Sequence, residues 1–175
     1  MSYTQFPAKK TLPANNNPGN IIYKPSGFKG GLYQLGNGTL VFDTMENGIA
    51  AMIGNLFWYY KSQIGAKKFS IKNILYKWCP PDDKKNPYLR GNDTNIYIKT
   101  VTNLTGLGAN DVLAWNKANI YKLVRAFCVQ EHGTDGVSVA DFNAAWEKLG
   151  QKDLGATAQE DSSFWWLAAG LLFFI

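Results

Sequence analysis

A carboxyl group at the end of an apolar helix is the residue of this sequence best placed to do chemistry. Four apolar residues recur at the i, i+3, i+4, i+7 spacing of a buried helical face, namely Ile120, Leu123, Val124 and Phe127. Glu131 continues this stripe one turn later, and Gly133 then follows as a residue that ends helices. A carboxyl at the edge of an apolar stripe is partly desolvated, which favours its protonated form and suits it to general-acid catalysis. The alternative is an exposed acid in the last turn.

Three other acids are candidates for a second catalytic carboxyl: Asp43, Glu46 and Asp135. Asp43 and Glu46 have the spacing of a capping box, which by itself explains both as residues that begin a helix. Asp135 lies in Thr-Asp-Gly, a turn signature. Glu46 is kept as the possible second acid, although none of the three is a compelling partner for Glu131.

The composition is that of one globular domain with extensions, at 175 residues and 46% hydrophobic. The net charge of +5 comes from scattered Lys and Arg, which indicates a general bias and predicts no nucleic-acid partner. The single histidine, His132, argues against a zinc site, and we expect neither metal nor cofactor. Cys79 and Cys128 are expected to be buried thiols, with a disulfide as the alternative.

Patterns along the chain predict an arm at residues 1–14, a domain at 15–150, a polar linker at 151–163 and a hydrophobic tail at 164–175. The N-terminus lacks the apolar core of a secretory signal. Within the domain we expect an Asn-Pro-Gly turn at 15–19, a short strand at 21–23 and a hairpin over 31–42. Helices are predicted at 43–64, 70–78, 94–105, 120–132 and 138–149. The fold class is therefore α+β, mainly α.

Several linked stretches resemble a family of phage virion proteins with a lysozyme-like domain that degrades the bacterial cell wall. They are NNNPGNI at 15–21, LVFDTMENGIAAMIGNLFWYY at 40–60, KNILYKWCPPDDKKNP at 72–87, NDTNIYIKTVTNLTG at 92–106 and RAFCVQEHG at 125–133. The third and fourth are similar to the family's R-W-A-P-P and N-D-T-x-x-Y-I-x-x-V segments, and the last to RA-x-x-x-x-E-x-G. The resemblance covers roughly residues 15 to 149.

The resemblance implies a lysozyme-like domain in circularly permuted order, with the turn and hairpin first and the Glu-bearing helix late. Such permutation is tolerated when the ends of a domain lie close together. Glu131 matches the family acid, and His132 stands where the family commonly has Asn.

The implied reaction is cleavage of the MurNAc–GlcNAc glycosidic bond of peptidoglycan. A hydrolase normally places a second carboxylate roughly 5–9.5 Å from the first. A lytic transglycosylase, as the family implies, needs one Glu, which protonates the leaving oxygen and then takes a proton from the sugar's own 6-hydroxyl. Because no compelling second acid is found, a lytic transglycosylase is preferred to a lysozyme-type hydrolase.

Sugar sites need aromatic faces and amide side chains. The predicted substrate-binding residues are Asn17, Asn20, Tyr23, Gln34 and Tyr60, with Tyr33 and Tyr59 as further lining candidates. The two asparagines could instead satisfy the turn, and each aromatic could belong to the core. The run Trp58-Tyr59-Tyr60 covers several helix faces, so at least one ring must point away from the core.

The tail at 164–175 would form a helix of about 18 Å, too short to span a bilayer core of about 30 Å. It could enter one leaflet of a viral membrane, fill a groove on another virion protein, or fold back onto the domain. The leading expectation is a virion enzyme, at a capsid vertex or viral membrane, that opens the host wall during phage entry. The alternative is a catalytically silent structural or wall-binding virion protein of lysozyme-like shape; a host-lysis enzyme is a third possibility.

Overall fold

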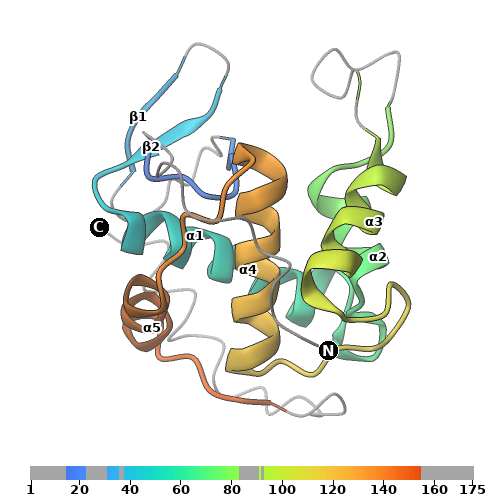
Figure 1. Cartoon of the computed structure of the whole chain (residues 1–175). Coiled ribbons are helices and arrows are strands. Elements are labelled where there is room, and N and C mark those ends of the chain that lie inside the picture. Colours follow the sequence, from blue (N-terminus) through green and yellow to red (C-terminus); the bar gives the residue numbers. More distant parts are fainter. Residues whose placement is uncertain (1–14, 23–30, 36–37, 83–90, 92, 155–175) are drawn as a thin grey trace.

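The computed structural model describes residues 15–22, 31–35, 38–82, 91 and 93–154. This part of the chain is mainly helical, with one two-stranded antiparallel sheet beside the helices (Figure 1). This content of helices and strands confirms the predicted class, α+β and mainly α. The predicted arm at 1–14, the predicted tail at 164–175 and Tyr23 lie outside the described residues.

The sheet is a ribbon of β1 (Gly31–Gln34) and β2 (Leu40–Phe42), as the hairpin pattern predicts. The asparagine-rich segment, residues 15–22, lies along the other edge of β2. The Leu40 N–H donates to the Ile21 carbonyl at 2.9 Å, and the Phe42 N–H donates to the Asn15 carbonyl at 3.0 Å. The segment is therefore fixed to the sheet by backbone hydrogen bonds at both of its ends.

The long first helix is α1 (Met45–Trp58), continued by a π-helical turn, η1 (Tyr59–Gln63). The predicted capping box of Asp43 with Glu46 is wrong: Thr44 is the N-cap and accepts from the Asn47 N–H. Asp43 instead accepts from the Asn47 side-chain amide at 2.6 Å. The predicted N-cap was one residue too early, because Asp43 and Thr44 are both suitable cap residues. Only the backbone conformation selects between them.

The remaining helices begin and end close to their predicted positions: α2 (Ile71–Trp78), α3 (Thr94–Thr105), α4 (Lys117–His132) and α5 (Val139–Lys148), with a short 3₁₀ turn, η2 (Ala66–Lys68). Ser70, Asp93 and Ser138 cap α2, α3 and α5. Helix α4 starts a turn before the predicted position, because Asn116 caps it. At its other end Gly133 adopts a left-handed φ of 70°, as predicted.

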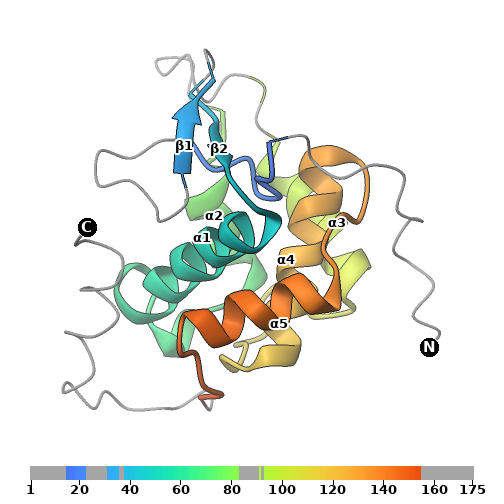
Figure 2. The ribbon, with the colours of Figure 1, turned by 90° about the vertical axis from the view of Figure 1, so that its left-hand side faces the viewer.

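Helix α1 packs against α5 and α4, while α3 packs against α4 and α2 (Figures 1 and 2). An aromatic cluster, buried except for the partly buried Phe57, forms part of the core: Phe57, Tyr60, Phe69, Trp115 and Trp146. None of the helices in the described ranges has both the length and the apolar character needed to cross a bilayer.

Gly48 marks a close approach of the asparagine-rich segment to α1. A Cβ placed on Gly48 would lie 1.8 Å from the backbone carbonyl oxygen of Asn16, so only glycine fits there. Gly19 is similarly enclosed, by the Trp78 and Met52 side chains. The segment is thus pressed onto the helices as well as bonded to the sheet.

Gly48→Ala should destabilise the domain by about 1–3 kcal/mol, because the added methyl group must displace backbone. Helix propensity alone would make the alanine variant more stable by about 1 kcal/mol. The sign of the change in the free energy of unfolding therefore distinguishes the two effects. Ala144→Gly, at an exposed position of α5, reports the ordinary propensity difference. Urea unfolding of the three proteins measures both effects; stabilisation by Gly48→Ala would contradict the close approach.

Candidate active site

The Glu131 carboxyl lies in the last turn of α4, partly buried, and each of its oxygens accepts a hydrogen bond. The Tyr97 hydroxyl donates to Oε1 at 2.6 Å, and the Asn20 side-chain amide donates to Oε2 at 3.1 Å. These donors come from positions 34 and 111 residues away in the sequence. The tertiary fold therefore fixes the orientation of this carboxyl.

Asn20 reaches Glu131 from a backbone conformation that non-glycine residues rarely adopt, with φ of 48°. Asn16, at the start of the same turn, also has a positive φ, 51°. Asparagine tolerates this left-handed region better than other side chains. The local strain is concentrated next to the acid, a pattern typical of functional sites.

Asn17 proves to be a structural residue, which corrects its prediction as a substrate ligand. Its side chain is fully buried, and its amide donates to the carbonyls of Ile21 at 3.0 Å and Leu40 at 2.9 Å. Its Oδ1 accepts from the Ile21 N–H at 2.9 Å. Its side chain therefore satisfies the turn, and burial keeps it from a ligand.

His132 ties the same turn to the end of α4. Its Nε2 lies 2.9 Å from the Asn17 carbonyl oxygen. A carbonyl can only accept, so Nε2 carries the proton in this contact. The last turn of α4 therefore holds the asparagine-rich segment twice, through Glu131 to Asn20 and through His132 to Asn17.

Tyr97 was missed by the sequence reasoning. Its side chain is 4% exposed. Burial, and to a smaller extent the nearby Glu131 charge, raises the pKa of Tyr97 well above its usual value. The phenol therefore stays protonated near neutral pH and acts as the donor to Glu131. The available signal was its place as the aromatic residue in NDTNIYIKTV, on the inner stripe of α3 with Val101.

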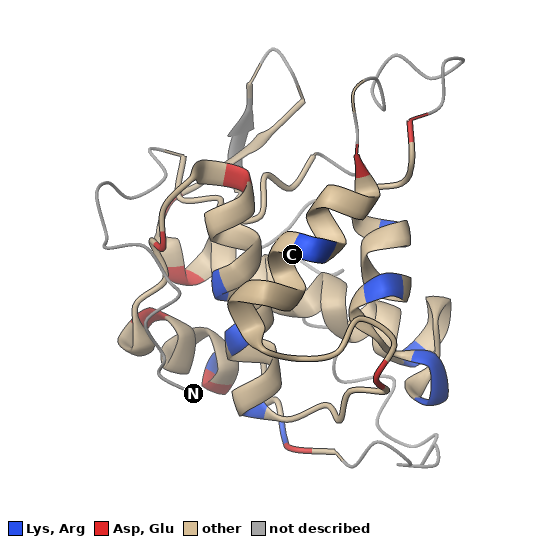
Figure 3. Ribbon diagram, turned by 45° about the vertical axis from the view of Figure 1, so that its right-hand side comes forward, with Lys and Arg blue, Asp and Glu red and all other residues tan. Residues whose placement is uncertain are grey.

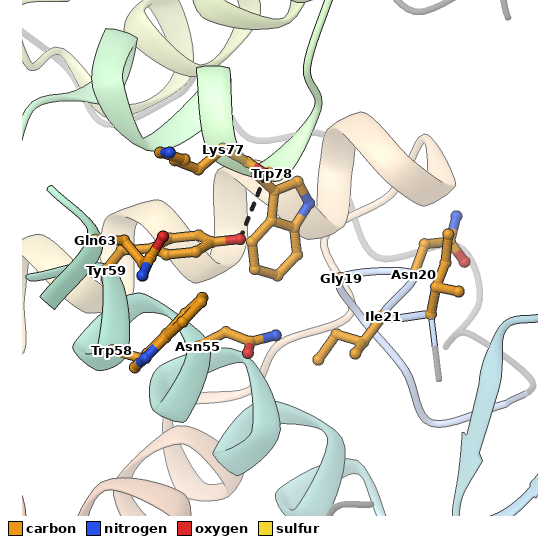
Figure 4. A pocket seen from close by; sticks show the side chains of 10 residues that line it. Gly19, Asn20, Ile21, Asn55, Trp58, Tyr59, Gln63, Lys77 and Trp78 are labelled. Atoms are coloured by element: carbon orange, nitrogen blue, oxygen red, sulfur yellow. Dashed lines mark hydrogen bonds between the residues drawn. The ribbon is translucent and has the colours of Figure 1, made fainter. Parts of the chain in front are cut away.

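A cleft of about 380 Å³ opens beside Asn20, between the asparagine-rich segment, the end of α1 and the end of α2 (Figure 4). Its walls combine aromatic rings, amide side chains and one cation: Trp58, Tyr59, Trp78, Asn20, Asn55, Gln63 and Lys77, with Gly19, Ile21 and Ile22 completing the lining. Asn20 both lines the cleft and donates to Glu131, whereas Glu131 itself is not among the lining residues.

The rings of Trp58, Tyr59 and Tyr60 divide between the cleft and the core where α1 passes into the π-helical turn. The Ile64 N–H donates to the Tyr59 carbonyl, five residues back, at 2.9 Å. Trp58 is 44% exposed, Tyr59 is 7% exposed with one side on the cleft, and Tyr60 is fully buried. The prediction that one ring points away from the core is confirmed for Trp58. The prediction of Tyr60 as a sugar ligand is wrong, because Tyr60 packs on Phe69 and Trp115 in the core.

Two of the three candidate second acids form ion pairs, and the third, Asp43, accepts from the Asn47 amide. Glu46 forms an ion pair with Lys148 of α5 at 2.7 Å. Asp135 forms one with Arg125, whose Nε donates to Oδ2 at 2.7 Å. Gln34, a predicted substrate-binding residue, lies in β1 with its backbone opposite Leu40, and its role stays a prediction.

Other reactive groups are few in the described part of the chain. Within those residues, no cluster of three or more His, Cys, Asp or Glu side chains could hold a metal ion. Cys79 and Cys128 are free thiols, of which Cys128 is buried and Cys79 partly so. Burial raises the pKa of both thiols, and the Glu131 charge contributes to each shift. Lys and Arg positions are distributed over several helices (Figure 3).

Comparison with known proteins adds no assignment. No protein-family model matches the sequence, and no curated protein matches it significantly.

Tyr59 gives the cleft a pH signature. Burial raises the pKa of Tyr59 to about 12, whereas an unfolded tyrosine titrates near 10. The unfolded state therefore loses its proton first, and stability that is complete below pH 10 is lost as the pH rises towards 12. Between these pH values, ionisation of Tyr59 should lower the free energy of unfolding by about 2–3 kcal/mol.

Urea unfolding of the parent and of Tyr59→Phe at pH 9 and pH 11.5 measures this term. The phenylalanine variant should lose less stability over the interval. Tyr76→Phe, at an exposed position of α2, serves as the control and should behave as the parent does. Equal losses in the parent and Tyr59→Phe would contradict a desolvated phenol at the cleft.

Proposed function

We propose that this protein is a peptidoglycan-degrading enzyme with a lysozyme-like domain, and that it acts as a lytic transglycosylase on the MurNAc–GlcNAc bond. The observation that carries the proposal is the Glu131 carboxyl, which accepts from Tyr97 and from Asn20, a residue that also lines an aromatic and amide-rich cleft. A positioned acid next to a sugar-sized concavity is what glycosidic-bond cleavage requires.

Glu131 begins the reaction protonated and gives its proton to the glycosidic oxygen that leaves. The C–O bond to the anomeric carbon breaks as the ring passes through an oxocarbenium-like state. The Glu131 carboxylate then takes the proton of the same sugar's 6-hydroxyl, whose oxygen closes onto the anomeric carbon. The product is a 1,6-anhydro end, and Glu131 is protonated again. Asn20 and Tyr97 act as positioning residues that keep the carboxyl aimed through both proton transfers.

The environment of the other acids supports a single-acid mechanism over hydrolysis with two carboxylates. Glu46 and Asp135 are engaged with Lys148 and Arg125, and each has a structural explanation. Neither is needed by the scheme above. The amides of Asn20, Asn55 and Gln63 suit the hydroxyl and N-acetyl groups of amino sugars, and the exposed ring of Trp58 suits a flat sugar face.

The proposed setting is a phage particle, where the enzyme opens the host cell wall during entry. The sequence resemblance to phage virion proteins supports this setting. The hydrophobic tail at 164–175 would attach the enzyme to a viral membrane or to other virion proteins.

Glu131→Gln should remove the clearing zone that the natural protein gives in a peptidoglycan zymogram. Loss of a general acid typically costs about 10²–10⁴-fold in rate, enough to abolish a visible zone. The substitution keeps the shape of the side chain, so thermal unfolding should stay close to that of the parent.

Glu46→Gln is the matched control, because it removes a carboxylate from α1 while leaving Glu131 intact. It should still clear. Clearing lost in Glu46→Gln as well would favour a two-carboxylate hydrolase, and no clearing by the natural protein would favour a silent virion or wall-binding protein.

Deleting residues 163–175 should abolish incorporation into particles and leave wall cleavage by the isolated protein unchanged. The physical reason is that the removed segment is apolar and follows a polar linker, outside the domain that carries Glu131. Immunoblots of purified particles measure incorporation, and zymograms measure cleavage. Normal incorporation of the truncated protein would rule out the tail as the attachment.

A further inference from the structure

The cleft beside Asn20 has a charge asymmetry that the proposed reaction does not use. Among the ten described residues that line it, Lys77 alone carries a charge. The others are aromatic, amide-bearing, aliphatic or glycine. No carboxylate of the described residues forms an ion pair with the Lys77 ammonium. With a neutral glycan in the cleft, the Lys77 ammonium would be solvated by water alone.

We propose that Lys77 is a specificity-determining residue, which binds a carboxylate carried on the sugar strand in the cleft. This inference rests on the proposed function and deepens it. It assigns the cleft to strands with an acidic peptide substituent, in preference to neutral strands of the same sugars.

The position of Lys77 suits such a contact. Lys77 is an exposed residue in the last turn of α2, beside the partly buried Trp78. Its backbone carbonyl accepts from the Tyr59 hydroxyl at 3.5 Å, which ties this turn of α2 to the opposite wall. Its side chain extends towards the end of the cleft where Tyr59 and Gln63 lie, away from Asn20 (Figure 4). The ammonium can therefore reach a group that projects out of the cleft.

The opposite wall provides a place for the sugar itself. Trp58 lines the cleft and is 44% exposed, and its ring packs at 40° to that of Tyr59. Asn55 and Gln63 come from the same helical stretch as Trp58 and supply amide groups. A sugar on this wall with a substituent long enough to cross the cleft would bring that substituent to Lys77. In peptidoglycan that substituent is a lactyl-linked peptide with free carboxylates, whereas chitin-type strands carry no charge.

The energetic expectation is modest, because the ammonium is solvated at the rim. An exposed ion pair changes affinity by no more than about fivefold. Lys77 should thus contribute a three- to fivefold preference for the acidic ligand and little to binding of the neutral sugar. Salt screens such a contact, so the preference should shrink as ionic strength rises.

Binding to the full-length Glu131→Gln protein tests the inference without turnover. Calorimetric titration compares three soluble ligands: a disaccharide peptide with free carboxylates, the same molecule with its carboxylates amidated, and a chitin oligomer. The first should bind three- to fivefold more tightly than the second. Lys77→Gln in the same background should remove that difference, and Lys72→Gln, on the same helix but outside the cleft, should keep it.

Three results would overturn the inference. The first is equal binding of the acidic and amidated ligands. The second is a preference that survives Lys77→Gln. The third is displacement of the acidic ligand by a phosphodiester polymer more effectively than by a free stem peptide, which would assign Lys77 to phosphate. Each leaves the proposed function intact if the natural protein still clears peptidoglycan. Absence of clearing together with absence of all glycan binding would instead overturn both.

Discussion

The structure depends on the buried side chain of Asn17. Its amide and carbonyl groups make three hydrogen bonds to the backbones of Ile21 and Leu40, which close the asparagine-rich turn and join it to β2. Each buried polar group left unpaired would cost about 1–3 kcal/mol, so the turn has little freedom to change shape. Its fixed shape is what allows Asn20, in a left-handed conformation, to reach an acid 111 residues away.

Three separate segments meet at this acid, and a fourth, α1, makes room for one of them. The asparagine-rich turn supplies Asn20, α3 supplies Tyr97, α4 supplies Glu131, and α1 admits the turn through Gly48. The close packing at Gly48 and the contact of His132 with the Asn17 carbonyl fix the turn from two sides. The orientation of the carboxyl thus depends on contacts throughout the domain. Asn20 belongs both to these contacts and to the wall of the cleft.

Local rules were enough to predict where the helices lie, most of their ends, and the place of Glu131 in the last turn of one of them. Ser70, Asp93, Ser138 and Gly133 begin or end helices through short-range hydrogen bonds and backbone preference, which are written in a few neighbouring residues. The break of the apolar stripe at position 131 was equally local. The choice of Thr44 over Asp43 as cap depended on backbone conformation, which the residue types alone do not decide.

Contacts between distant segments were beyond the same rules. Tyr97 had the spacing of a core residue, and only the packing of α3 on α4 brings its hydroxyl to Glu131. Asn17 and Asn20 have the same residue type and lie in the same turn, yet one is enclosed and the other lines the cleft. Tyr60 was misassigned because its aromatic type was weighed above its spacing: it follows Ile53 and Leu56 at i+7 and i+4 on the buried stripe of α1.

The central claim is that Glu131 acts as a solitary acid and base on a glycan strand. Mass spectrometry of the sugars that the protein releases from purified peptidoglycan tests it most directly. The account predicts 1,6-anhydro ends, 18 Da lighter than their hydrated counterparts because no water is added. Reducing ends would contradict the single-acid mechanism, and the absence of any released fragment would contradict the assignment of Glu131 as a catalytic residue.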